Sequence, residues 1–381
     1  MILFFSIITV LYLLLILALA FGFDTIETFK VEDIKAETKF SVIIPFRNEA
    51  ENLLELLETI KILNYPKSHY EIIFVNDDSN DDSVEIISKV LDTISKTNEI
   101  TQTNIRIINN VRVSNSPKKD AITSAIAIAK YDWIVTTDAD CILPKFWLDT
   151  IDCFIQKKHC KMVVAPVTYF NVNSFLKRFQ ILDFLSLIGA TIGGFGIGRP
   201  FLCNGANLAY SKALFIALDG FKGNDVIASG DDIFLLQKAI KEDKKAVRFL
   251  KSRSAIVKTK PQQTLHKLIS QRKRWAAKTS SYNSVFGKLV GLIVLLMNAT
   301  LVSGLALALF GLLDYTALLY VFIIKNLIDF LLIFKTTRFF EQEKYLSSFL
   351  FSSLLYPFFS LFIVFISMFF KYKWKDRSFK K

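Results

Sequence analysis

The stretch WIVTTDADCILP, residues 133–144, decides the fold that this sequence predicts. Its first half is β-branched and apolar, as in a buried strand, and it ends in two acids, Asp138 and Asp140, separated by one alanine. Residues i and i+2 of an extended chain face the same way, so we expect these two side chains about 6 to 7 Å apart. Their repulsion calls for a partner, and a divalent cation that bridges to a phosphate would supply one. The alternative is a solvated turn after a strand.

Similar short strands are predicted on both sides of this stretch. The predicted strands are residues 40–44, 72–75, 105–108, 133–137 and 162–165. Helical patterns at 49–62, 84–94 and 120–129 alternate with them, which predicts βαβ units and a mostly parallel, Rossmann-like α/β sheet. Ligands of such sheets bind beyond the carboxyl ends of the strands.

Polar residues follow three of these predicted strands. They are PFRNE at 45–49, NDDS at 76–79 and DAD at 138–140. Because the carboxyl ends of parallel strands meet at one edge of a sheet, this edge would gather acids and hydrogen-bonding groups.

The composition indicates a membrane protein. Of the 381 residues, 52% are hydrophobic, and the mean hydropathy is +0.38. Residues 1–23 carry no charge and are long enough to cross a bilayer, which predicts an N-terminal anchor. A sequence resembling a signal-peptidase site, Ala18-Leu19-Ala20, lies within this segment, but no basic region precedes it. Further predicted spans are residues 289–313, 315–334 and 346–370.

The charged residues and the cysteines narrow the function class. The net charge of +12 fits the cytoplasmic flanks of membrane spans, and no nucleic-acid partner is expected because the lysines flank apolar segments. The four cysteines form no CxxC pair, which indicates reduced thiols in a cytosolic compartment and no zinc site.

Six stretches taken in order carry a family resemblance. They are FSVIIPFRNEAENL, EIIFVNDDSNDDS, SPKKDAITSAIAIAKYDWIVTTDAD, FLCNGANLAYSKALF, SGDDIFLLQKAI and QRKRW. Over residues 38–280 this set resembles the family 2 glycosyltransferases with a GT-A fold. Its Gln-x-x-Arg-Trp motif is similar to that of membrane-bound polysaccharide synthases and ceramide glucosyltransferase-like enzymes. We therefore expect a GT-A domain with interfacial helices at 38–285, a transmembrane bundle at 286–370 and a basic tail at 371–381.

The resemblance implies a site for a nucleotide sugar, with UDP as the family's common donor. Asp77 and Asp78 would hold the base and ribose, beside a wall formed by the 45–49 loop. Asp138 and Asp140 match the family's D-x-D and would bind Mn²⁺ or Mg²⁺, with Asp140 as the more direct ligand. The full set of donor residues implied is Pro45, Glu49, Asp77, Asp78, Lys118, Asp138 and Arg274.

The resemblance also implies a general base and an acceptor side. Asp232 matches the second acid of the family's Glu-Asp pair, which deprotonates the acceptor hydroxyl. Asp231 stands where the family often has Glu, and Thr123 where it often has Asn. The acceptor-binding residues implied are Gln271, Trp275, Asp231 and Asn207.

Residues 264–281 are predicted to form a helix that carries Gln271, Arg274 and Trp275 on one face. Arg274 would pair with the diphosphate, and Trp275 would stack on an acceptor. A basic helix lying on the membrane is the alternative, and the two interpretations are compatible. Its lipid-facing residues would be Lys267, Arg272, Lys273 and Lys278.

Two further segments are informative. Residues 174–198 are predicted to form an interfacial helix and then a flexible glycine-rich lip at 193–198, with a buried core helix and loop as the alternative. Lys325 and Asp329 lie four residues apart in a predicted span and are expected to pair within it.

The sequence thus predicts an integral membrane protein of the cell or inner membrane with a cytoplasmic catalytic domain. It would transfer one sugar, with inversion, from a nucleotide sugar to a lipid or glycan acceptor, in contact with membrane lipids. Processive polysaccharide synthesis and a non-catalytic nucleotide- or membrane-binding protein are the alternatives. The basic residues Lys335, Arg338 and Lys344 favour a cytoplasmic loop, whereas a full crossing by 346–370 would place the basic tail outside. Pro357 allows a bent hairpin or an interfacial segment there, so the number of crossings stays open.

Overall fold

The computed structural model divides the chain into two compact units. One unit comprises residues 27–170 and 203–260, and the other comprises 1–26, 171–202 and 261–381. The structure describes residues 2–96, 104–224, 227, 229–279, 282–370, 372–374 and 377–379. The side chains of the basic tail at 371–381 lie outside this description, and so does Met1 of the predicted anchor.

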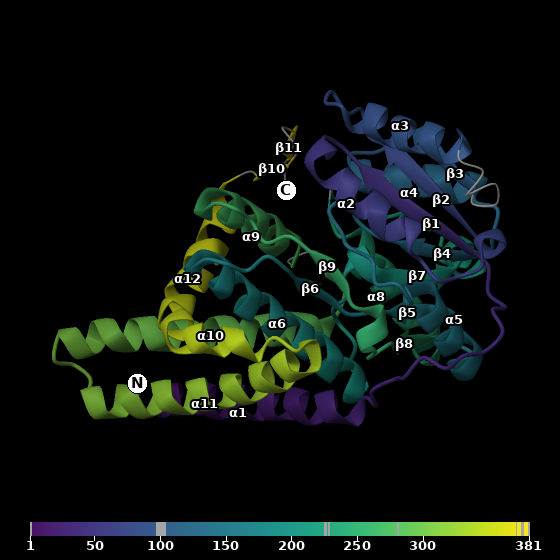
Figure 1. The fold of residues 1–381 in the computed structure, drawn as a ribbon. Coiled ribbons are helices and arrows are strands. Elements are labelled where there is room, and N and C mark those ends of the chain that lie inside the picture. Colours follow the sequence, from purple (N-terminus) through teal and green to yellow (C-terminus); the bar gives the residue numbers. More distant parts are fainter. Residues whose placement is uncertain are drawn as a thin grey trace. The chain divides into compact units, whose positions relative to one another are not determined.

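The first unit, here called the sheet unit, is built on a seven-stranded sheet in the order β3-β2-β1-β4-β7-β5-β8 (Figure 1). Its strands are β1 (Phe40–Phe46), β2 (Tyr70–Asn76), β3 (Asn104–Asn109), β4 (Trp133–Thr136), β5 (Met162–Val164), β7 (Leu208–Ser211) and β8 (Val247–Phe249). Strand β1 runs parallel to both β2 and β4, and only β7 runs against its neighbours. The predicted mostly parallel α/β sheet is therefore confirmed.

Helices connect these strands and bury their apolar faces on the sheet. They are α2 (Ala50–Lys61), α3 (Ser83–Lys96), α4 (Pro117–Ile128), α5 (Trp147–Lys158), α7 (Lys212–Ala217) and α8 (Asp231–Asp243). In α2 the buried residues are Leu53, Leu56, Leu57 and Ile60, the spacing of one helix face. Helix α4 begins with Pro117, whose fixed φ suits the first turn. All five strands and all three helices predicted in this region are present.

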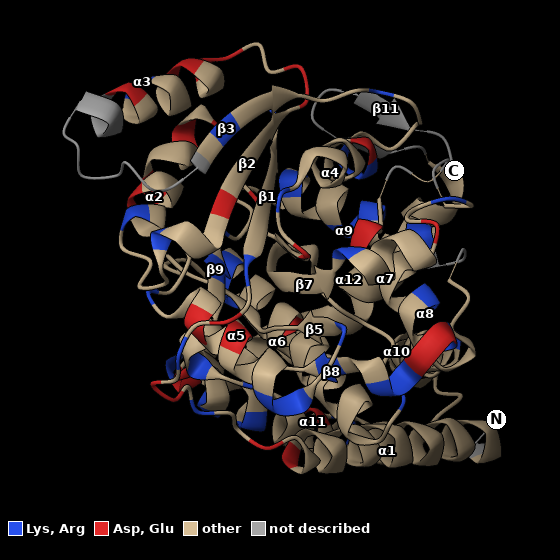
Figure 2. Cartoon of the chain, turned by 90° about the vertical axis from the view of Figure 1, so that its right-hand side faces the viewer, with Lys and Arg blue, Asp and Glu red and all other residues tan. Residues whose placement is uncertain are grey.

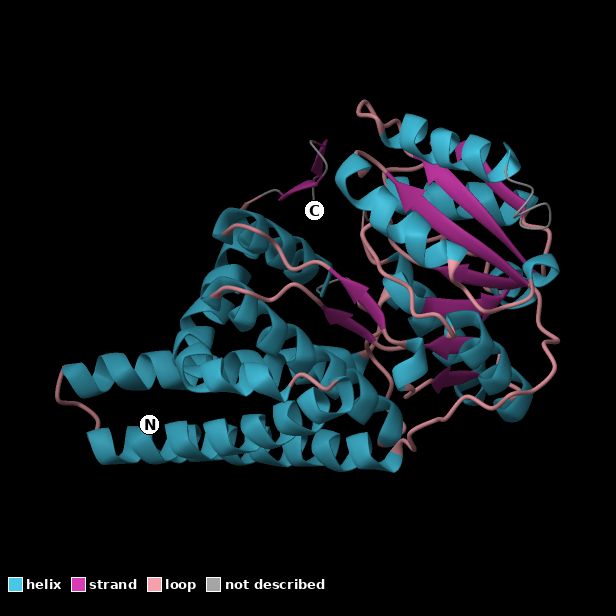
Figure 3. Ribbon diagram, in the orientation of Figure 1, coloured by secondary structure: helices cyan, strands magenta, loops and turns pink. Residues whose placement is uncertain are grey.

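A second, two-stranded sheet joins β6 (Val167–Tyr169) to β9 (Val257–Thr259) (Figure 3). Short 3-10 helices fill several of the remaining connections. They are η1 (Lys67–His69), η2 (Gly205–Asn207), η3 (Lys244–Ala246), η4 (Arg253–Ala255) and η5 (Glu343–Ser348).

The second unit, here called the helical unit, consists of long helices and one short hairpin. The helices are α1 (Ile2–Thr25), α6 (Phe175–Gly196), α9 (Leu265–Thr279), α10 (Val285–Leu309), α11 (Tyr315–Phe340) and α12 (Phe349–Phe369), and the hairpin pairs β10 (Tyr372–Trp374) with β11 (Arg377–Phe379). Within the described residues, five helices are long and apolar enough to cross a membrane: α1, α6, α10, α11 and α12. Figure 2 shows α1 almost without charged residues.

Helix α6 agrees with the alternative of a buried core helix and not with the predicted lip, because the glycine-rich segment is helical up to Gly196 and most of the helix is buried. A Cβ atom at Gly193 would collide with the carbonyl oxygen of Leu19, and one at Gly196 with that of Gly22. The glycines are therefore needed for close packing of α6 against α1, as in membrane helix pairs that approach through small residues.

The helices α1 and α11 run in the same direction. Asp24, near the end of α1, forms an ion pair with Lys335, near the end of α11. At the other end of α1, Phe5 packs against Leu313, which lies between α10 and α11. Between these ends, the predicted pair of Lys325 and Asp329 is present, with Nζ and Oδ2 2.6 Å apart.

Helix α12 is continuous through Pro357, so the hairpin considered for this segment is not formed. A helix can accommodate an internal proline in a membrane when neighbouring groups compensate for the lost hydrogen bond. The side of the membrane on which the tail lies stays a prediction.

Candidate active site

The candidate site lies at the edge of the sheet where β1, β2 and β4 end. Strand β1 is the point at which the order reverses, with β2 on one side and β4 on the other. In open α/β sheets, ligands bind beyond the carboxyl ends of the strands at such a reversal point. The residues that follow these three strands are the polar ones that the sequence singled out.

Asp138 lies on a turn and contacts a lysine. The strand ends at Thr136, and the Cys141 N–H donates to the Asp138 carbonyl at 3.2 Å. The two acids of the D-x-D therefore lie on a turn, and the prediction that strand alternation sets their spacing is wrong. The Lys118 ammonium lies 2.6 Å from Asp138 Oδ1 and neutralises this carboxylate.

Asp140 accepts a weak hydrogen bond from the thiol of Cys141, with Sγ and Oδ1 3.8 Å apart. Burial, and then the neighbouring Asp140 and Asp138, raise the pKa of the Cys141 thiol well above its ordinary value. Burial and the two acids therefore disfavour the thiolate form of Cys141.

Asp231 and Asp232 occupy the first turn of α8. This turn follows Gly230, whose φ of 87° lies in the left-handed region that glycine adopts easily. The two oxygens of Asp232 accept from the N–H of Ile233 at 2.7 Å and from the N–H of Gly205 at 3.2 Å. Two backbone donors thus fix the orientation of this carboxylate.

Lys118 joins the two acidic turns, because its Nζ also lies 3.4 Å from Asp231 Oδ2. Burial works against the charge on Lys118. The carboxylates of Asp138, Asp231 and Asp232 outweigh that effect and hold the pKa of Lys118 well above its ordinary value. Residues that are 20 and about 100 positions apart in sequence therefore form one charged cluster.

Asn207, which was expected on the acceptor side, is fully buried. Its Nδ2 donates to the carbonyls of Pro166 and Ala255, and its Oδ1 accepts from Trp147 Nε1 at 2.9 Å. The side chain is thus committed to holding the segment that precedes β7.

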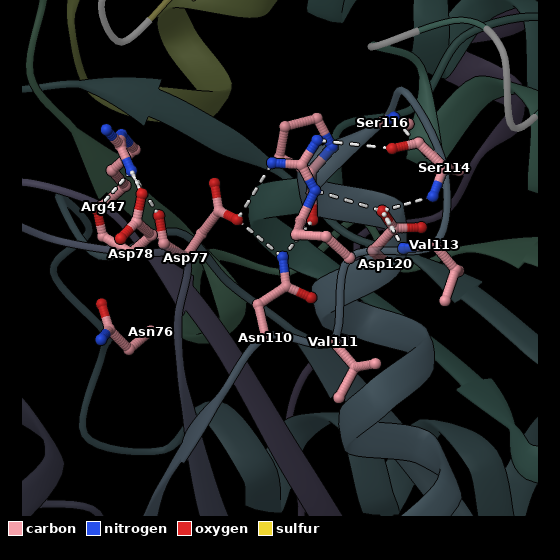
Figure 4. Close-up of polar contacts among 12 residues, drawn as sticks. Arg47, Asn76, Asp77, Asp78, Asn110, Val111, Val113, Ser114, Ser116 and Asp120 are labelled. Carbon is pink, nitrogen blue, oxygen red and sulfur yellow. Dashed lines mark hydrogen bonds and ion pairs between the residues drawn. The ribbon is translucent and has the colours of Figure 1, made fainter.

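The two acids after β2 have different surroundings. Asp77 is 5% exposed and accepts from Asn110 Nδ2 at 2.7 Å (Figure 4). The side chain of Asp78 is 85% exposed, and its φ of 61° is one that Asp tolerates better than most residues. Asp77 is therefore part of a packed network, whereas Asp78 faces solvent.

The loop after β1 is hydrogen-bonded to the loop after β2. Arg47 Nη1 donates to the Asp77 carbonyl at 2.7 Å and lies 3.1 Å from Asp78 Oδ2. The Glu49 N–H donates to Ser83 Oγ at 2.8 Å. Pro45 lies within β1, opposite Val75. This geometry agrees with a wall beside the acids that follow β2.

The sequence reasoning missed the residues after β3. Arg112 bridges Asp77 and Asp120, with nitrogen to oxygen distances of 3.6 and 3.3 Å. Asp120 also accepts from the N–H groups of Val113 and Ser114 (Figure 4). The sequence did contain a sign of these residues, because β3 ends at Asn109, Asn110 follows it, and this end lies at the same edge of the sheet as the acids.

The Gln-x-x-Arg-Trp segment belongs to the helical unit, where the predicted helix is present as α9. Arg272 does not face lipid phosphates as the membrane-surface alternative required, because it is buried and its Nε donates to Asp183 of α6 at 2.7 Å. The Arg272 guanidinium also lies 4.1 Å from the centre of the Trp275 ring. One face of that ring is thus covered.

Comparison with known proteins identifies the family. A family model described as glycosyl transferase family group 2 matches residues 133–372, more than half of the chain, and one described as glycosyl transferase family 2 matches residues 41–216. The chain is a family 2 glycosyltransferase.

Among curated proteins, this glycosyltransferase is similar to poly-beta-1,6-N-acetyl-D-glucosamine synthases. It is 28% identical over 145 residues to that of Staphylococcus aureus (strain COL), which covers 37% of this chain and 32% of the relative. With that of Staphylococcus epidermidis it shares 26% over 152 residues, or 39% and 33% of the two chains. The chain thus matches about a third of the length of these relatives.

Among solved structures, the glycosyltransferase resembles a mannosyltransferase of Pyrobaculum calidifontis that was solved with GDP-Man and Mn²⁺. The TM-score is 0.58 at 17% identity, over 93% of this chain and 98% of the other. This likeness supports the GT-A fold expected from the sequence.

The residues of the glycosyltransferase fit a metal ion that arrives with its substrate. Within the described ranges, no three His, Cys, Asp or Glu side chains gather to hold an ion by themselves. Mg²⁺ is usually bound by one or two carboxylates together with substrate phosphates and water. Asp138 and Asp140 provide two carboxylates on an accessible turn, which suits that arrangement.

Proposed function

We propose that this glycosyltransferase transfers one sugar from a nucleotide sugar to a lipid acceptor, with inversion, at the cytosolic face of a membrane. The observation that carries the proposal is the cluster of Asp138, Asp231 and Asp232 around Lys118 at the reversal point of the sheet. A site for sugar transfer needs groups that bind the leaving diphosphate and a base that deprotonates the nucleophile. At this edge, Lys118 and Asp138 are proposed for the first task and Asp232 for the second.

Asp232 is the proposed general base. The acceptor hydroxyl attacks the anomeric carbon, the new carbon–oxygen bond forms as the bond to the diphosphate breaks, and the hydroxyl proton passes to Asp232. A single displacement of this kind inverts the anomeric centre. The two backbone N–H groups that hold Asp232 support the role, because a base must be oriented toward the proton that it takes.

Asp138 and Asp140 are the proposed ligands of Mn²⁺ or Mg²⁺. Such an ion, when bound with the donor, neutralises the charge that develops on the departing diphosphate. Lys118 and Arg274 are the proposed cationic partners of the diphosphate, since charge-assisted bonds to phosphate are among the strongest that side chains make.

The proposed nucleoside site lies at the ends of β1 to β3. The exposed Asp78 is the proposed partner of a ribose or base, while Asp77, Asn110 and Arg112 fix the loop beside it. We propose a UDP-linked donor. N-acetylglucosamine is the first sugar to test, because the matched relatives are named as synthases of a polymer of that sugar.

The proposed acceptor is a lipid, with Gln271, Trp275 and Asp231 on its side of the site. Five helices suited to a membrane lie in the same chain, and α9 carries Gln271 and Trp275 just before α10. In the proposed topology, Asp24 and Lys335 lie at the cytosolic side, where a basic residue is favoured.

Processive polymer synthesis is the second candidate, and the names of the matched relatives favour it. The two candidates differ in the size of the product.

The test uses the full chain purified in detergent, with labelled nucleotide sugars, a lipid extract and Mn²⁺, followed by mass analysis. A lipid carrying a single added sugar supports the proposal. A ladder of products supports the second candidate instead, and no metal-dependent transfer from any donor would reject both. The same reactions are run with Asp232→Asn purified in the same way, and any transfer that persists at the parent's rate is attributed to a contaminant.

A further inference from the structure

The Lys118 ammonium occupies the place between two acidic turns. It lies 2.6 Å from Asp138 Oδ1 and 3.4 Å from Asp231 Oδ2, and its side chain is only 18% exposed. Asp138 is 38% exposed and Asp231 is 12% exposed, so solvent screens these contacts incompletely. The cluster therefore contains its own cation without any bound metal.

The chain holds this lysine firmly in place. Lys118 follows Pro117 in the first turn of α4. The next residue, Lys119, is 2% exposed and donates to the carbonyls of Asn224 and Ile227. These contacts restrict the backbone at the start of α4, so the fold places the Lys118 side chain within reach of both acidic turns.

Gly205 closes the cluster on another side. A Cβ atom there would lie 2.9 Å from Asp231 Oδ2 and 3.5 Å from Lys118 Nζ. The backbone thus packs directly against the ion pair.

Lys118 and a metal ion would therefore compete for the carboxylate of Asp138. Asp138 is a proposed metal ligand, and it already forms its shortest contact with Lys118. A metal that uses Asp138 must compete with an ammonium that is covalently part of the protein, which is present at high effective concentration. A diphosphate would change this balance, because it brings negative charge that attracts both the metal and the lysine.

We propose that Lys118 is the resident cation of the donor-free enzyme, which fills the place between Asp138 and Asp231 until metal and nucleotide sugar bind together. The inference rests on the proposed function, which supplies the diphosphate and the metal. Lys118 then exchanges a carboxylate for a phosphate oxygen, and no covalent bond changes. Metal alone binds weakly, and the coupling between metal and nucleotide is reciprocal.

The test measures Mn²⁺ binding by electron paramagnetic resonance on the full chain in detergent, with and without UDP. In the unaltered protein we expect UDP to tighten Mn²⁺ binding by about tenfold or more. In Lys118→Met, Mn²⁺ without UDP should bind about tenfold more tightly than in the unaltered protein, and the effect of UDP should shrink. Lys118→Arg keeps the charge and should bind Mn²⁺ alone as weakly as the unaltered protein.

Lys241→Met is the matched control. Like Lys118→Met, it removes one positive charge. Lys241 is exposed and lies near the end of α8, whereas Asp231 and Asp232 lie at its start, so Mn²⁺ binding should not change. Lys118→Gln replaces Lys118→Met if the latter does not fold, as judged by circular dichroism.

Unchanged or weaker Mn²⁺ binding in the folded Lys118→Met or Lys118→Gln protein overturns the proposal. This result is distinct from a failure of the proposed function, because binding is read without any transfer reaction. If the unaltered protein transfers sugar but Lys118→Met has the same Mn²⁺ affinity, only the resident-cation role is refuted. Tighter Mn²⁺ binding in Lys118→Met supports that role even if no sugar donor is turned over.

Discussion

The Nε atom of Arg272 donates to Asp183 Oδ2 at 2.7 Å, and the two side chains are 7% and 6% exposed. The pair joins α9 to α6 inside the helical unit. Trp275 packs on the guanidinium of this arginine and lies near Phe184, with ring centres 6.3 Å apart. Asp183 therefore orients Trp275 through Arg272.

Asp183→Asn should destabilise the protein by about 3 to 5 kcal/mol, because it leaves the Arg272 charge buried without its counter-ion. Thermal unfolding in detergent measures this loss. The double variant Asp183→Leu with Arg272→Met replaces both charges with apolar groups and should recover most of the stability. A single variant as stable as the parent would show that the pair contributes nothing.

Asp232→Asn should lower kcat by about two to four orders of magnitude, since an amide cannot take the acceptor proton. Donor affinity should stay within about twofold of the parent, because the amide oxygen can still accept from Gly205. Transfer rates and equilibrium binding of UDP measure the two effects. Normal transfer by the variant would disprove the assignment of the base.

Asp140→Ala should weaken donor binding in the presence of Mn²⁺ and have little effect on binding in the presence of a chelator. The reason is that the proposed role of this carboxylate is exercised through the metal. Calorimetric titration with UDP, once with Mn²⁺ and once with a chelator, measures the two affinities. Equal losses with and without metal would indicate a structural role for Asp140 instead.

Asp77→Ala should reduce both stability and donor affinity, whereas Asp78→Ala should reduce donor affinity alone. Asp77 is buried with Asn110 and Arg112, so its removal should cost about 1 to 3 kcal/mol of stability as well as donor affinity. Asp78 is exposed, so its removal should reduce donor affinity with little change in unfolding. Thermal unfolding and UDP binding on both variants check the contrast, which fails if Asp78→Ala is the less stable protein.

Gly193→Ala should destabilise the helical unit by about 1 to 3 kcal/mol through overpacking, because its methyl group would meet the Leu19 backbone. Gly291→Ala is the matched control in α10, where a Cβ atom has no neighbour within 4 Å. That substitution should be neutral or slightly stabilising. Thermal unfolding compares the two, and equal stability would show that the close approach of α1 and α6 is unimportant.

Much of the sheet unit was predictable because its secondary structure follows from local patterns in the sequence. The parallel strands at 72–75, which is buried, and at 105–108, which is partly buried, are short runs rich in β-branched residues. Amphipathic helices such as α2 repeat apolar residues on one face. The acids after β2 and β4 were found for the same reason, since each follows its strand directly. The turn at residues 138–141 was considered only as the alternative to an extended chain, and the hydrogen bond between Cys141 and Asp138 ends the alternation on which the expected spacing depended.

The sequence by itself determined the alternation of strands and helices, the apolar segments, and the edge of the sheet at which acids would gather. These features follow from the period and polarity of neighbouring residues. Only the tertiary structure decided that Lys118 joins Asp138 to Asp231, that Arg272 is buried against Asp183, and that Gly193 serves helix packing. Each of these contacts joins residues far apart in the chain, and the partner of a charge or a glycine is set by which elements pack together.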